Sequence, residues 1–415
     1  MNHIIALLPY KHFEETFISI INVIQKTKID VTIAGNIKKE DIPQYPFIKD
    51  VIHIPSADMF VQNEKELYKI LDAFYARKPF SAIINFFEEY VELAAKITKR
   101  YGLNGNSERT AKLTRDKYEM RKELLKNNIR VPQFIKVNSY ESFLKAIDTV
   151  GLPCVAKPTD AMASEGVLKI ESTKNLESIY VNMIKTNKEI VKSDHNELLV
   201  EEYIDGPEVS VESVVSNGEL KIMGITEKTT EEEPFFNEIM HIHPAPLEEK
   251  IEREIYTMTE KAVKTLNIQF GGVHLEARLS KKGPTIIEIA SRLGGDAIPS
   301  LVSLSKGYDP YHYVFRSGLN LPVALNKTRD KYAGIRFIQT NQEGILKEIF
   351  FDDNELYKIP GIISKRIFGR IGEFIARPPK GRTNRLAYVT VAGRSYDKVR
   401  ENLLKIENCL KFKIE

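Results

Sequence analysis

The chain has 415 residues, of which 42% are hydrophobic and 28% are charged, as is ordinary for a globular protein. That length allows about two to four domains. The formal net charge of +3 gives no sign of a polyanionic partner, so a nucleic acid-binding protein is not expected.

Three further features indicate the compartment. The first residues, MNHIIALLPY, lack a basic start and read as a strand rather than a secretion signal. No apolar run approaches the ~18 residues that a membrane-spanning helix needs. The two cysteines, Cys154 and Cys409, have no metal-ligand spacing and predict neither a disulfide framework nor a zinc site. We therefore expect a cytoplasmic protein with no membrane partner.

Strand and helix patterns alternate over residues 1–105. Short apolar runs such as IIALL and AIINF read as strands, and amphipathic runs such as EETFISIINVIQKT read as helices. This alternation is typical of a parallel sheet covered by helices. No GxGxxG follows the first strand, so a dinucleotide site is not expected here. Gly and Asn residues in 102–107 predict the end of this first domain.

The second predicted domain covers residues 106–320, with a small lobe at about 127–205. Its apolar runs LPCVAKP, GVLKIES, ELLVEEYI and EVSVESVV read as strands, and an Asn217-Gly218 hairpin turn follows the last one. A polar, acid-rich stretch over 226–243 reads as a loop. Residues 321–415 show strands and one helix, and we expect them to form a third domain of α+β type.

Two glutamates within residues 271–295 are the most informative feature of the chain. The runs HLEARL and TIIEIA read as two strands joined by a turn at 281–284. Glu276 and Glu288 lie equally far from Lys282, so a simple hairpin places them opposite each other on one face. Side chains in such a pair stand about 4.5–5.5 Å apart, where like charges repel each other.

Two opposed carboxylates need a cation to neutralise them. Oxygen ligands of this kind suit Mg²⁺ or Mn²⁺, with phosphate oxygens and water completing the coordination. Glu276 and Glu288 are therefore the candidate metal ligands. The alternative is a solvated hairpin face on which the two acids pair with Arg278 and Arg292.

Lys157 stands at the end of the strand pattern GLPCVAKP and is followed by TDAMASEG, a stretch of small and polar residues. A strand, such a loop and a second strand can cover a polyphosphate, because backbone N–H groups and the ammonium share its negative oxygens. Ser164 and Gly166 are the candidate contacts in this loop. The alternative is an ordinary surface lysine at a strand end.

The segment LLVEEYIDGPEVSVE contains a strand that ends at Glu201-Glu202-Tyr203-Ile204, before a Gly-Pro turn. Its backbone N–H and C=O groups at an edge would match the donor and acceptor edge of adenine. Glu208 lies beyond this turn, where it can accept hydrogen bonds from ribose hydroxyls. By itself the segment is also typical of an ordinary hairpin.

Arg292 and Gly294-Gly295-Asp296 follow the second glutamate. Arginine binds a carboxylate or a phosphate through two parallel hydrogen bonds, and glycine lets backbone N–H groups approach a ligand closely. We therefore expect Arg292 to hold a substrate or phosphate group and residues 294–296 to line a substrate pocket. The alternative is a plain turn with a surface arginine.

In their order along the chain, these elements resemble the ATP-grasp superfamily over about residues 110–300. The resemblance implies the ATP-grasp fold, an α/β and α+β architecture with a preceding parallel-sheet domain and a following α+β lid domain. It also implies that ATP and Mg²⁺ (or Mn²⁺) bind, that Lys117 and Lys157 hold the phosphates, and that the strand ending at Ile204 reads adenine. An E-x-x-x-R run from Glu288 to Arg292 ends such a site.

Within the superfamily, the runs VAKP, EIASRLGG and RLAYVTVAG look most like those of L-amino-acid ligases, the dipeptide synthetases. The resemblance implies that the chain joins amino acids, as small-molecule substrates, through an acyl phosphate. Glu238 or His241 would then contact a substrate ammonium or assist proton transfer, with turn capping as the alternative for His241. The chain departs from the family pattern at Ala290, where many relatives have asparagine, and in a covering loop without paired glycines.

Two other functions stay open on sequence grounds. Basic residues near the C-terminus would suit docking of a carrier protein, so a ligase acting on a carrier protein or another amine is the first alternative. A non-catalytic nucleotide-binding protein is the second, although opposed carboxylates argue against it. For the oligomeric state, a homodimer is the general expectation. The basic residues are Lys365, Arg366, Arg370, Arg377, Lys380, Arg382 and Arg385.

Overall fold

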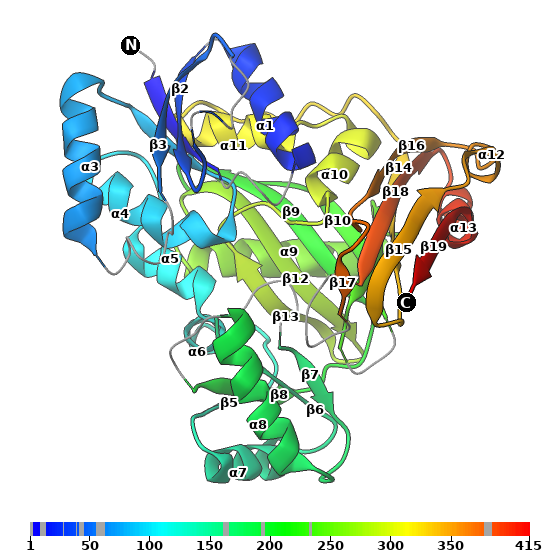
Figure 1. The fold of residues 1–415 in the computed structure, drawn as a ribbon. Coiled ribbons are helices and arrows are strands. Elements are labelled where there is room, and N and C mark those ends of the chain that lie inside the picture. Colours follow the sequence, from blue (N-terminus) through cyan, green and yellow to red (C-terminus); the bar gives the residue numbers. More distant parts are fainter. Residues whose placement is uncertain are drawn as a thin grey trace.

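The computed structural model describes residues 3–8, 14–27, 29–38, 40, 45–54, 63–160, 166–191, 196–231, 235–376 and 384–415. Among these residues the strands form four sheets, one of eight strands, two of four and one of three. Figure 1 shows how these sheets are arranged. No helix in this part of the chain is long and apolar enough to span a membrane. The predicted domain boundaries at 105/106 and 320/321 stay predictions.

The N-terminal sheet is parallel, with strand order β3-β2-β1-β4, which confirms the prediction from the alternating pattern. Its central strand β1 is buried along its whole length, as expected for a sheet with both faces covered. The elements are β1 (His3–Leu7), α1 (Glu14–Thr27), β2 (Asp30–Gly35), β3 (Ile48–His53), α3 (Glu64–Arg77), β4 (Ala82–Asn85), the short 3₁₀-helix η2 (Glu88–Tyr90) and α4 (Val91–Tyr101).

Two consecutive helices lead from this sheet to the small lobe. Asp116 lies between them in an extended conformation, and its side chain accepts hydrogen bonds from the N–H groups of Tyr118 and Glu119. An aspartate in this role caps a new helix, which is why the helical pattern breaks here. The helices are α5 (Glu108–Arg115) and α6 (Lys117–Lys126).

The small lobe is a four-stranded antiparallel sheet of order β5-β8-β6-β7, shown at the bottom of Figure 1 with α7 and α8. Strand β8 therefore lies inside the sheet, between β5 and β6. The elements are β5 (Phe134–Val137), α7 (Tyr140–Val150), β6 (Cys154–Pro158), β7 (Leu168–Ile170), α8 (Leu176–Thr186), the π-helical turn η3 (Asn187–Val191) and β8 (Leu198–Glu202).

The largest sheet is antiparallel and has the order β13-β12-β9-β10-β11-β14-β18-β16. Its strands before residue 300 and those after residue 330 are joined where β11 pairs with β14. The elements are β9 (Glu208–Ser216), β10 (Glu219–Thr230), β11 (Glu238–His243), α9 (Glu249–Thr265), β12 (Phe270–Ser280), β13 (Gly283–Ala290), α10 (Ile298–Lys306), α11 (Pro310–Gly318), β14 (Tyr332–Gln339), β16 (Ile362–Ile367), β18 (Arg385–Gly393) and α13 (Tyr396–Lys405).

A small three-stranded sheet of order β17-β15-β19 completes the described structure near the C-terminus. Its elements, with the short helices beside them, are β15 (Gly344–Phe351), α12 (Asp353–Leu356), β17 (Phe374–Ile375), η4 (Ile406–Cys409) and β19 (Leu410–Ile414).

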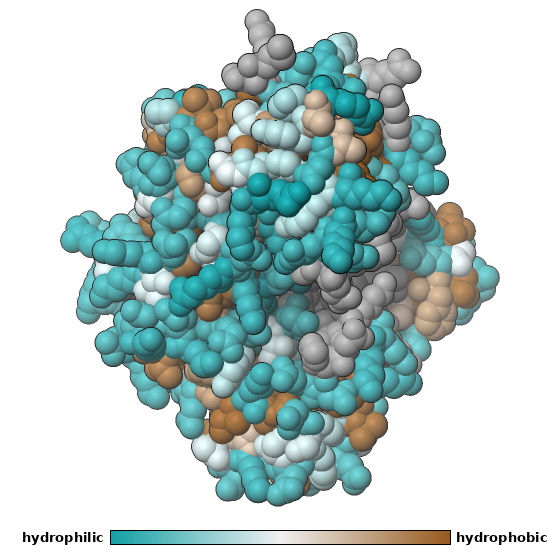
Figure 2. Space-filling view, turned by 90° about the vertical axis from the view of Figure 1, so that its left-hand side faces the viewer, coloured by the Kyte–Doolittle hydropathy of each residue, from teal (hydrophilic) through white to brown (hydrophobic). Residues whose placement is uncertain are grey.

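On the opposite side of the molecule, Figure 2 shows a face largely covered by hydrophilic side chains, with the hydrophobic ones in small groups.

The loop expected over 226–243 is wrong. Strand β10 continues to Thr230, and β11 begins at Glu238. Both faces of β11 are covered, since Met240 and Ile242 join a hydrophobic core while His241 and His243 are fully buried. Buried histidines read as polar in a sequence, which hid the strand.

The Asn217-Gly218 hairpin turn between β9 and β10 is confirmed. Both residues have positive φ angles, +52° and +78°, and Glu219 pairs with Ser216 across the turn. This is the turn geometry for which Asn-Gly is favoured, because its twist matches that of the two strands.

The turn that joins the small lobe to the large sheet leaves no room for a side chain. Gly206 lies between β8 and β9 with a φ of +137°, and a Cβ atom built on it would lie 2.2 Å from the carbonyl oxygen of Leu279. The neighbouring Pro207 carbonyl accepts a hydrogen bond from the Leu279 N–H group at 2.9 Å. The small lobe thus connects to β12 through a close backbone contact.

We predict that Gly206→Ala lowers the free energy of unfolding by about 2 kcal/mol or more, because it adds a steric clash to an unfavourable φ. Gly102→Ala is the matched control, since Gly102 also has a positive φ (+63°) but nothing within 4 Å of its added Cβ. That control is expected to cost about 1 kcal/mol. Urea unfolding measures both, and equal losses would contradict the clash.

Candidate functional site

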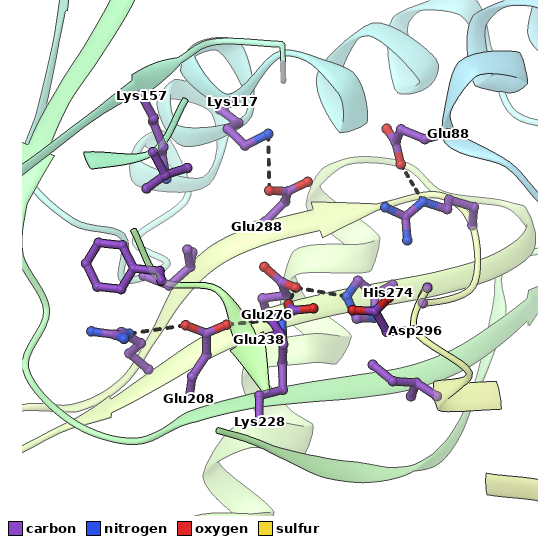
Figure 3. Close-up of a pocket in the computed structure, with 18 of the residues that line it drawn as sticks. Glu88, Lys117, Lys157, Glu208, Lys228, Glu238, His274, Glu276, Glu288 and Asp296 are labelled. Atoms are coloured by element: carbon purple, nitrogen blue, oxygen red, sulfur yellow. Dashed lines mark hydrogen bonds and ion pairs between the residues drawn. The ribbon is translucent and has the colours of Figure 1, made fainter. Parts of the chain in front are cut away.

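A cavity of about 310 Å³ lies where the N-terminal region, the small lobe and the large sheet meet. Charged side chains reach it from all three parts, as Figure 3 shows. Its lining includes Glu88, Lys117, Lys157, Glu201, Glu202, Tyr203, Ile204, Glu208, Lys228, Glu238, His274, Glu276, Arg278, Glu288, Arg292, Gly294, Gly295, Asp296 and Arg385.

Glu276 and Glu288 are direct partners across the β12–β13 pair, as the hairpin argument predicts. The reason differs from the simple symmetry about Lys282. The strands close on a tight turn in which Ser280 pairs with Gly283, and this register alone would offset the glutamates by one residue. A bulge between Glu276 and Ala277 leaves one extra residue on β13 and restores the pairing.

Each of these two carboxylates has a lysine partner. The Glu288 carboxylate lies 3.1 Å from the ammonium of Lys117, and the Glu276 carboxylate accepts a hydrogen bond from Lys228. Figure 3 shows Lys117 reaching down to Glu288 from the helix above it. The alternative of pairing with Arg278 and Arg292 is wrong, because these two arginines form their ion pairs with Glu208 and Glu88.

Lys228, a residue that the sequence analysis did not single out, is the cation at the centre of the acidic side of the cavity. Its side chain is 2% exposed, and its ammonium lies 2.6 Å from Glu238 and 3.1 Å from Glu208, in addition to Glu276. Burial alone would lower the pKa of Lys228, but these carboxylates raise it well above its ordinary value. The lysine therefore stays charged and holds the three glutamates together.

His274 forms a second link behind Glu276. Its Nδ1 atom is hydrogen-bonded to Glu212, and its Nε2 atom lies 3.1 Å from Glu276. Burial would lower the pKa of His274, but Glu212 and then Glu276 raise it to about 9. Glu212 also accepts a hydrogen bond from the Gly294 N–H group at 2.9 Å. The imidazolium thus connects the hairpin to the glycine pair.

Lys157 is buried on β6, and its ammonium lies 2.5 Å from the carboxylate of Glu201 on β8. Burial, with a smaller effect of the Arg121 charge, lowers the pKa of Lys157 to about 8. Gly166, the first described residue after Asp160, has a φ of +70°. The candidate contact Ser164 lies outside the described residues.

The expected strand edge at 201–204 is only partly present. Glu201 pairs with residues of both neighbouring strands, and the Glu202 N–H group donates to the Gln133 carbonyl at 2.8 Å. Tyr203 and Ile204 lie beyond the end of β8 and line the cavity. Within this segment, the backbone groups that remain to bind adenine are therefore those of Tyr203 and Ile204. The Ile204 carbonyl already accepts a hydrogen bond from Arg278.

Glu208 and Arg292 both have partners of their own. The Glu208 carboxylate lies 3.3 Å from Arg278 as well as beside Lys228. Arg292 donates to Glu88 at 2.5 Å, and Glu88 in turn lies 3.3 Å from Arg115. Glu88 follows strand β4 of the N-terminal sheet, so this pair joins the first sheet to the hairpin. The sequence offered no signal for it beyond an acidic residue after a strand.

His241 lies on β11 with its side chain completely buried, so the turn-capping alternative is wrong. Its Nε2 atom is 3.6 Å from Glu238 and 3.8 Å from Asp296. Within the described structure neither ring nitrogen has a hydrogen-bond partner. Burial lowers its pKa, but Asp296 and Glu238 raise it above the ordinary value overall.

Arg385 belongs to the site and not to a basic surface. Its guanidinium is 2.7 Å from Asp296, donates to the Glu238 carbonyl at 3.0 Å and lies 3.8 Å from the centre of the Phe337 ring. Of the predicted basic cluster, Lys365 pairs with Asp353, and three members lie outside the described residues. Those three are Arg377, Lys380 and Arg382.

The donor set fits a divalent cation. Glu276 and Glu288 are oxygen donors at directly paired positions, and carboxylate oxygens of Glu208, Glu238 and Glu276 lie within 4.8 Å of one another. Ala290 is buried opposite His274 and adds no oxygen ligand. Lys228 already contacts three of these carboxylates, so a bound cation would share them with its ammonium.

Comparison with known proteins supports the fold. The family model of the ATP-grasp domain matches residues 150–300. A solved L-amino acid ligase from Bacillus licheniformis superposes with a TM-score of 0.82 over 100% of this chain and 99% of that one, at 21% sequence identity. Residues 150–300 thus match the ATP-grasp domain, and the chain as a whole has the ATP-grasp fold.

Among curated proteins, the chain is similar to ligases. It is 28% identical over 255 residues to the alanine–anticapsin ligase of Bacillus subtilis, covering 57% of this chain and 53% of that protein. It is 22% identical over 305 residues to an L-arginine-specific L-amino acid ligase of Bacillus subtilis, covering 72% and 71%. The chain thus matches about half the length of the first of these relatives.

We predict that Lys228→Met destabilises the protein by about 3 kcal/mol, because it leaves three partly buried carboxylates without their common cation. Lys221→Met is the matched control on the same strand, since Lys221 pairs with the exposed Glu219. The control is expected to change the free energy of unfolding by less than about 1 kcal/mol. Urea unfolding at neutral pH measures both, and a small loss for Lys228→Met would contradict the central role of the ammonium.

A second prediction concerns His243, which is fully buried with its Nδ1 atom 2.6 Å from the Ser305 hydroxyl. Burial lowers its pKa to about 3. Below about pH 6.5 the unfolded chain binds a proton at this residue and the folded chain does not, so stability falls as pH decreases, by about 1.4 kcal/mol per pH unit. We expect His243→Asn to remove this slope between pH 6 and 5, as measured by urea unfolding at each pH. An unchanged slope would show that His243 does not stay neutral.

Proposed function

We propose that the chain is an ATP-dependent ligase that joins the carboxylate of one L-amino acid to the amine of another through an acyl phosphate, releasing ADP and phosphate. The observation that carries the proposal is the cavity in which Lys117 and Lys157 face the paired Glu276 and Glu288. Anion-binding lysines and cation-binding carboxylates on opposite walls suit a metal–nucleotide complex between them.

The nucleotide would lie between the small lobe and the large sheet. Tyr203 and Ile204, beyond the end of β8, would contact the base, and Glu208 would accept hydrogen bonds from ribose. Lys117 and Lys157 would bind the phosphates. Glu276 and Glu288 would hold Mg²⁺ or Mn²⁺, which when bound supplies positive charge that draws electron density from the phosphate oxygens.

The chemical difficulty is that a carboxylate must approach a phosphate although both are negative. Lys117, Lys157 and Arg292 lower this repulsion, because their positive charges surround the space in which the two groups meet. Arg292 is fixed by Glu88 and does not have to be ordered when substrate arrives. These residues bind and orient the reacting groups and stabilise the charge that develops on the transferred phosphate.

The amino acids would occupy the side of the cavity formed by β11, 294–296 and β18. Glu238 and Asp296 offer carboxylates for a substrate ammonium, and Arg385 offers a guanidinium for a carboxylate. His241 lies between these two acids. An amine must lose a proton before it attacks an acyl phosphate, and His241 in its neutral form would accept that proton.

The relatives support the choice of amino acids as substrates. An alanine–anticapsin ligase, an arginine-specific ligase and a solved L-amino acid ligase are all named for amino acid substrates. The main argument for a carrier-protein acceptor was a basic surface near the C-terminus. Arg385 does not belong to such a surface, because it lines the cavity and contacts Asp296. We therefore prefer free amino acids, and we keep the homodimer and the cytoplasmic location as predictions.

The test is release of ADP and phosphate from ATP with Mg²⁺ across a matrix of single and paired L-amino acids, with mass spectrometry of the products. We expect release only with particular pairs and a product mass equal to the two amino acids minus water. ADP release that is the same across the whole matrix would contradict a free amino acid acceptor. No ATP turnover at all would contradict the ligase itself.

Glu276→Gln tests the metal role in the same assay and is expected to reduce product formation about 100-fold or more, because it weakens the binding of the cation that offsets the phosphate charge. Glu219→Gln is the control, since Glu219 is exposed on β10 and pairs with Lys221. Full activity of His241→Ala, with loss in Glu276→Gln, would show that the histidine does not take part in proton transfer.

A further inference from the structure

Arg121 is the largest side chain among the described residues that is fully buried, and it is charged. It lies on α6, one turn after Lys117, and its Nη2 atom is 2.7 Å from the carboxylate of Glu201. Glu201 uses its other carboxylate oxygen for Lys157, at 2.5 Å. One carboxylate is therefore shared by two cations.

This arrangement leaves a positive charge in the interior. Removing a charge from water costs several kcal/mol unless an opposite charge offsets it. Glu201 can offset Arg121 or Lys157 but not both when both are protonated. Arg121 has no exposed surface, whereas Lys157 lines the cavity, so the unbalanced charge faces the cavity through Lys157.

The rest of the Arg121 side chain is fixed by the backbone. Nη2 donates to the carbonyl of Ile287 at 2.9 Å, and Nη1 donates to the carbonyl of Lys117 at 3.3 Å. Ile287 is the extra residue of the β13 bulge and directly precedes Glu288. Because these contacts hold the guanidinium beside Glu201, Lys157 cannot become the sole partner of that carboxylate.

We propose that Arg121 is a positioning residue that takes half of the Glu201 carboxylate and thereby keeps the Lys157 charge available for the phosphates of the nucleotide. The proposal rests on the nucleotide-binding part of the proposed function. It assigns Glu201 to charge sharing inside the small lobe, in addition to its place in the segment beside the base.

The charges that face Lys157 give the proposal a pH signature. They are Glu201 from β8 and Arg121 and Lys117 from α6. Burial and then Arg121 lower the pKa of Lys157 to about 8. Nucleotide affinity should accordingly fall as pH rises above about 8, while the phosphates themselves complete their ionisation near pH 6. Without Arg121, Glu201 would hold the proton on Lys157 to a higher pH.

The experiment is isothermal titration of a non-hydrolysable ATP analogue with Mg²⁺, at intervals from pH 7 to 9.5. Wild type should lose about tenfold in affinity as Lys157 deprotonates above pH 8. Arg121→Gln should bind about tenfold more weakly already at pH 7, and its fall should begin about one pH unit higher. Arg121→Lys keeps the charge and should retain the wild-type onset.

Lys157→Arg is the control that identifies the titrating group. Arginine stays charged throughout this range, so the fall due to residue 157 should disappear in that variant. Any fall that persists belongs to another group such as His274, whose pKa is raised to about 9. A fall of wild-type size in Lys157→Arg would overturn the proposal.

The outcomes separate the two levels of inference. Wild type that binds no nucleotide at any pH would refute the proposed function itself. An Arg121→Gln variant that binds more weakly by the same factor at every pH would show a merely structural arginine and overturn the inference. If Arg121→Gln does not fold, Glu201→Gln serves instead, because loss of the shared carboxylate should move the onset below pH 8. An unchanged onset in that variant would also overturn it.

Discussion

The requirement that every buried charge meet an opposite one governs this structure more than any single element. Lys228 holds three glutamates, Glu201 serves two cations, and Arg292 is bound by Glu88. These contacts join the N-terminal sheet, the small lobe and the large sheet at one place. Burying any one of these charges alone would destabilise the fold, but each is offset by its partner. The cavity that they surround therefore suits a ligand with charges of both signs.

Local sequence patterns made much of the fold predictable. The parallel N-terminal sheet follows from alternating apolar and amphipathic runs, and the Asn217-Gly218 turn follows from φ preferences that few other residues share. The pairing of Glu276 with Glu288 was also predictable, although symmetry about Lys282 reached it for an incomplete reason. The bulge that restores the register depends on how β13 packs, which spacing alone does not reveal.

The remainder was out of reach because it depends on contacts between distant residues. Glu88 and Arg292 are 204 positions apart in the chain, and Arg121 and Ile287 are 166 apart. The sequence around Glu88 does not indicate that it pairs with a distant arginine. The strand β11 was missed for a related reason, since its two histidines are buried by elements that arrive more than 50 residues later, including Ser305. Arg385 was taken for surface charge on the same grounds.

The junction of β11 with β14 has a mechanical consequence. Because strands on both sides of residue 320 share one hydrogen-bonded sheet, the C-terminal part cannot swing as a separate flap, and cutting the chain there would expose the backbone of β11 as a raw edge prone to self-association. Arg385 would leave with the removed piece. The small lobe, by contrast, has a sheet of its own and joins the large one through the turn at Gly206. We therefore expect the cavity to open and close by movement of the small lobe, while the large sheet stays in place.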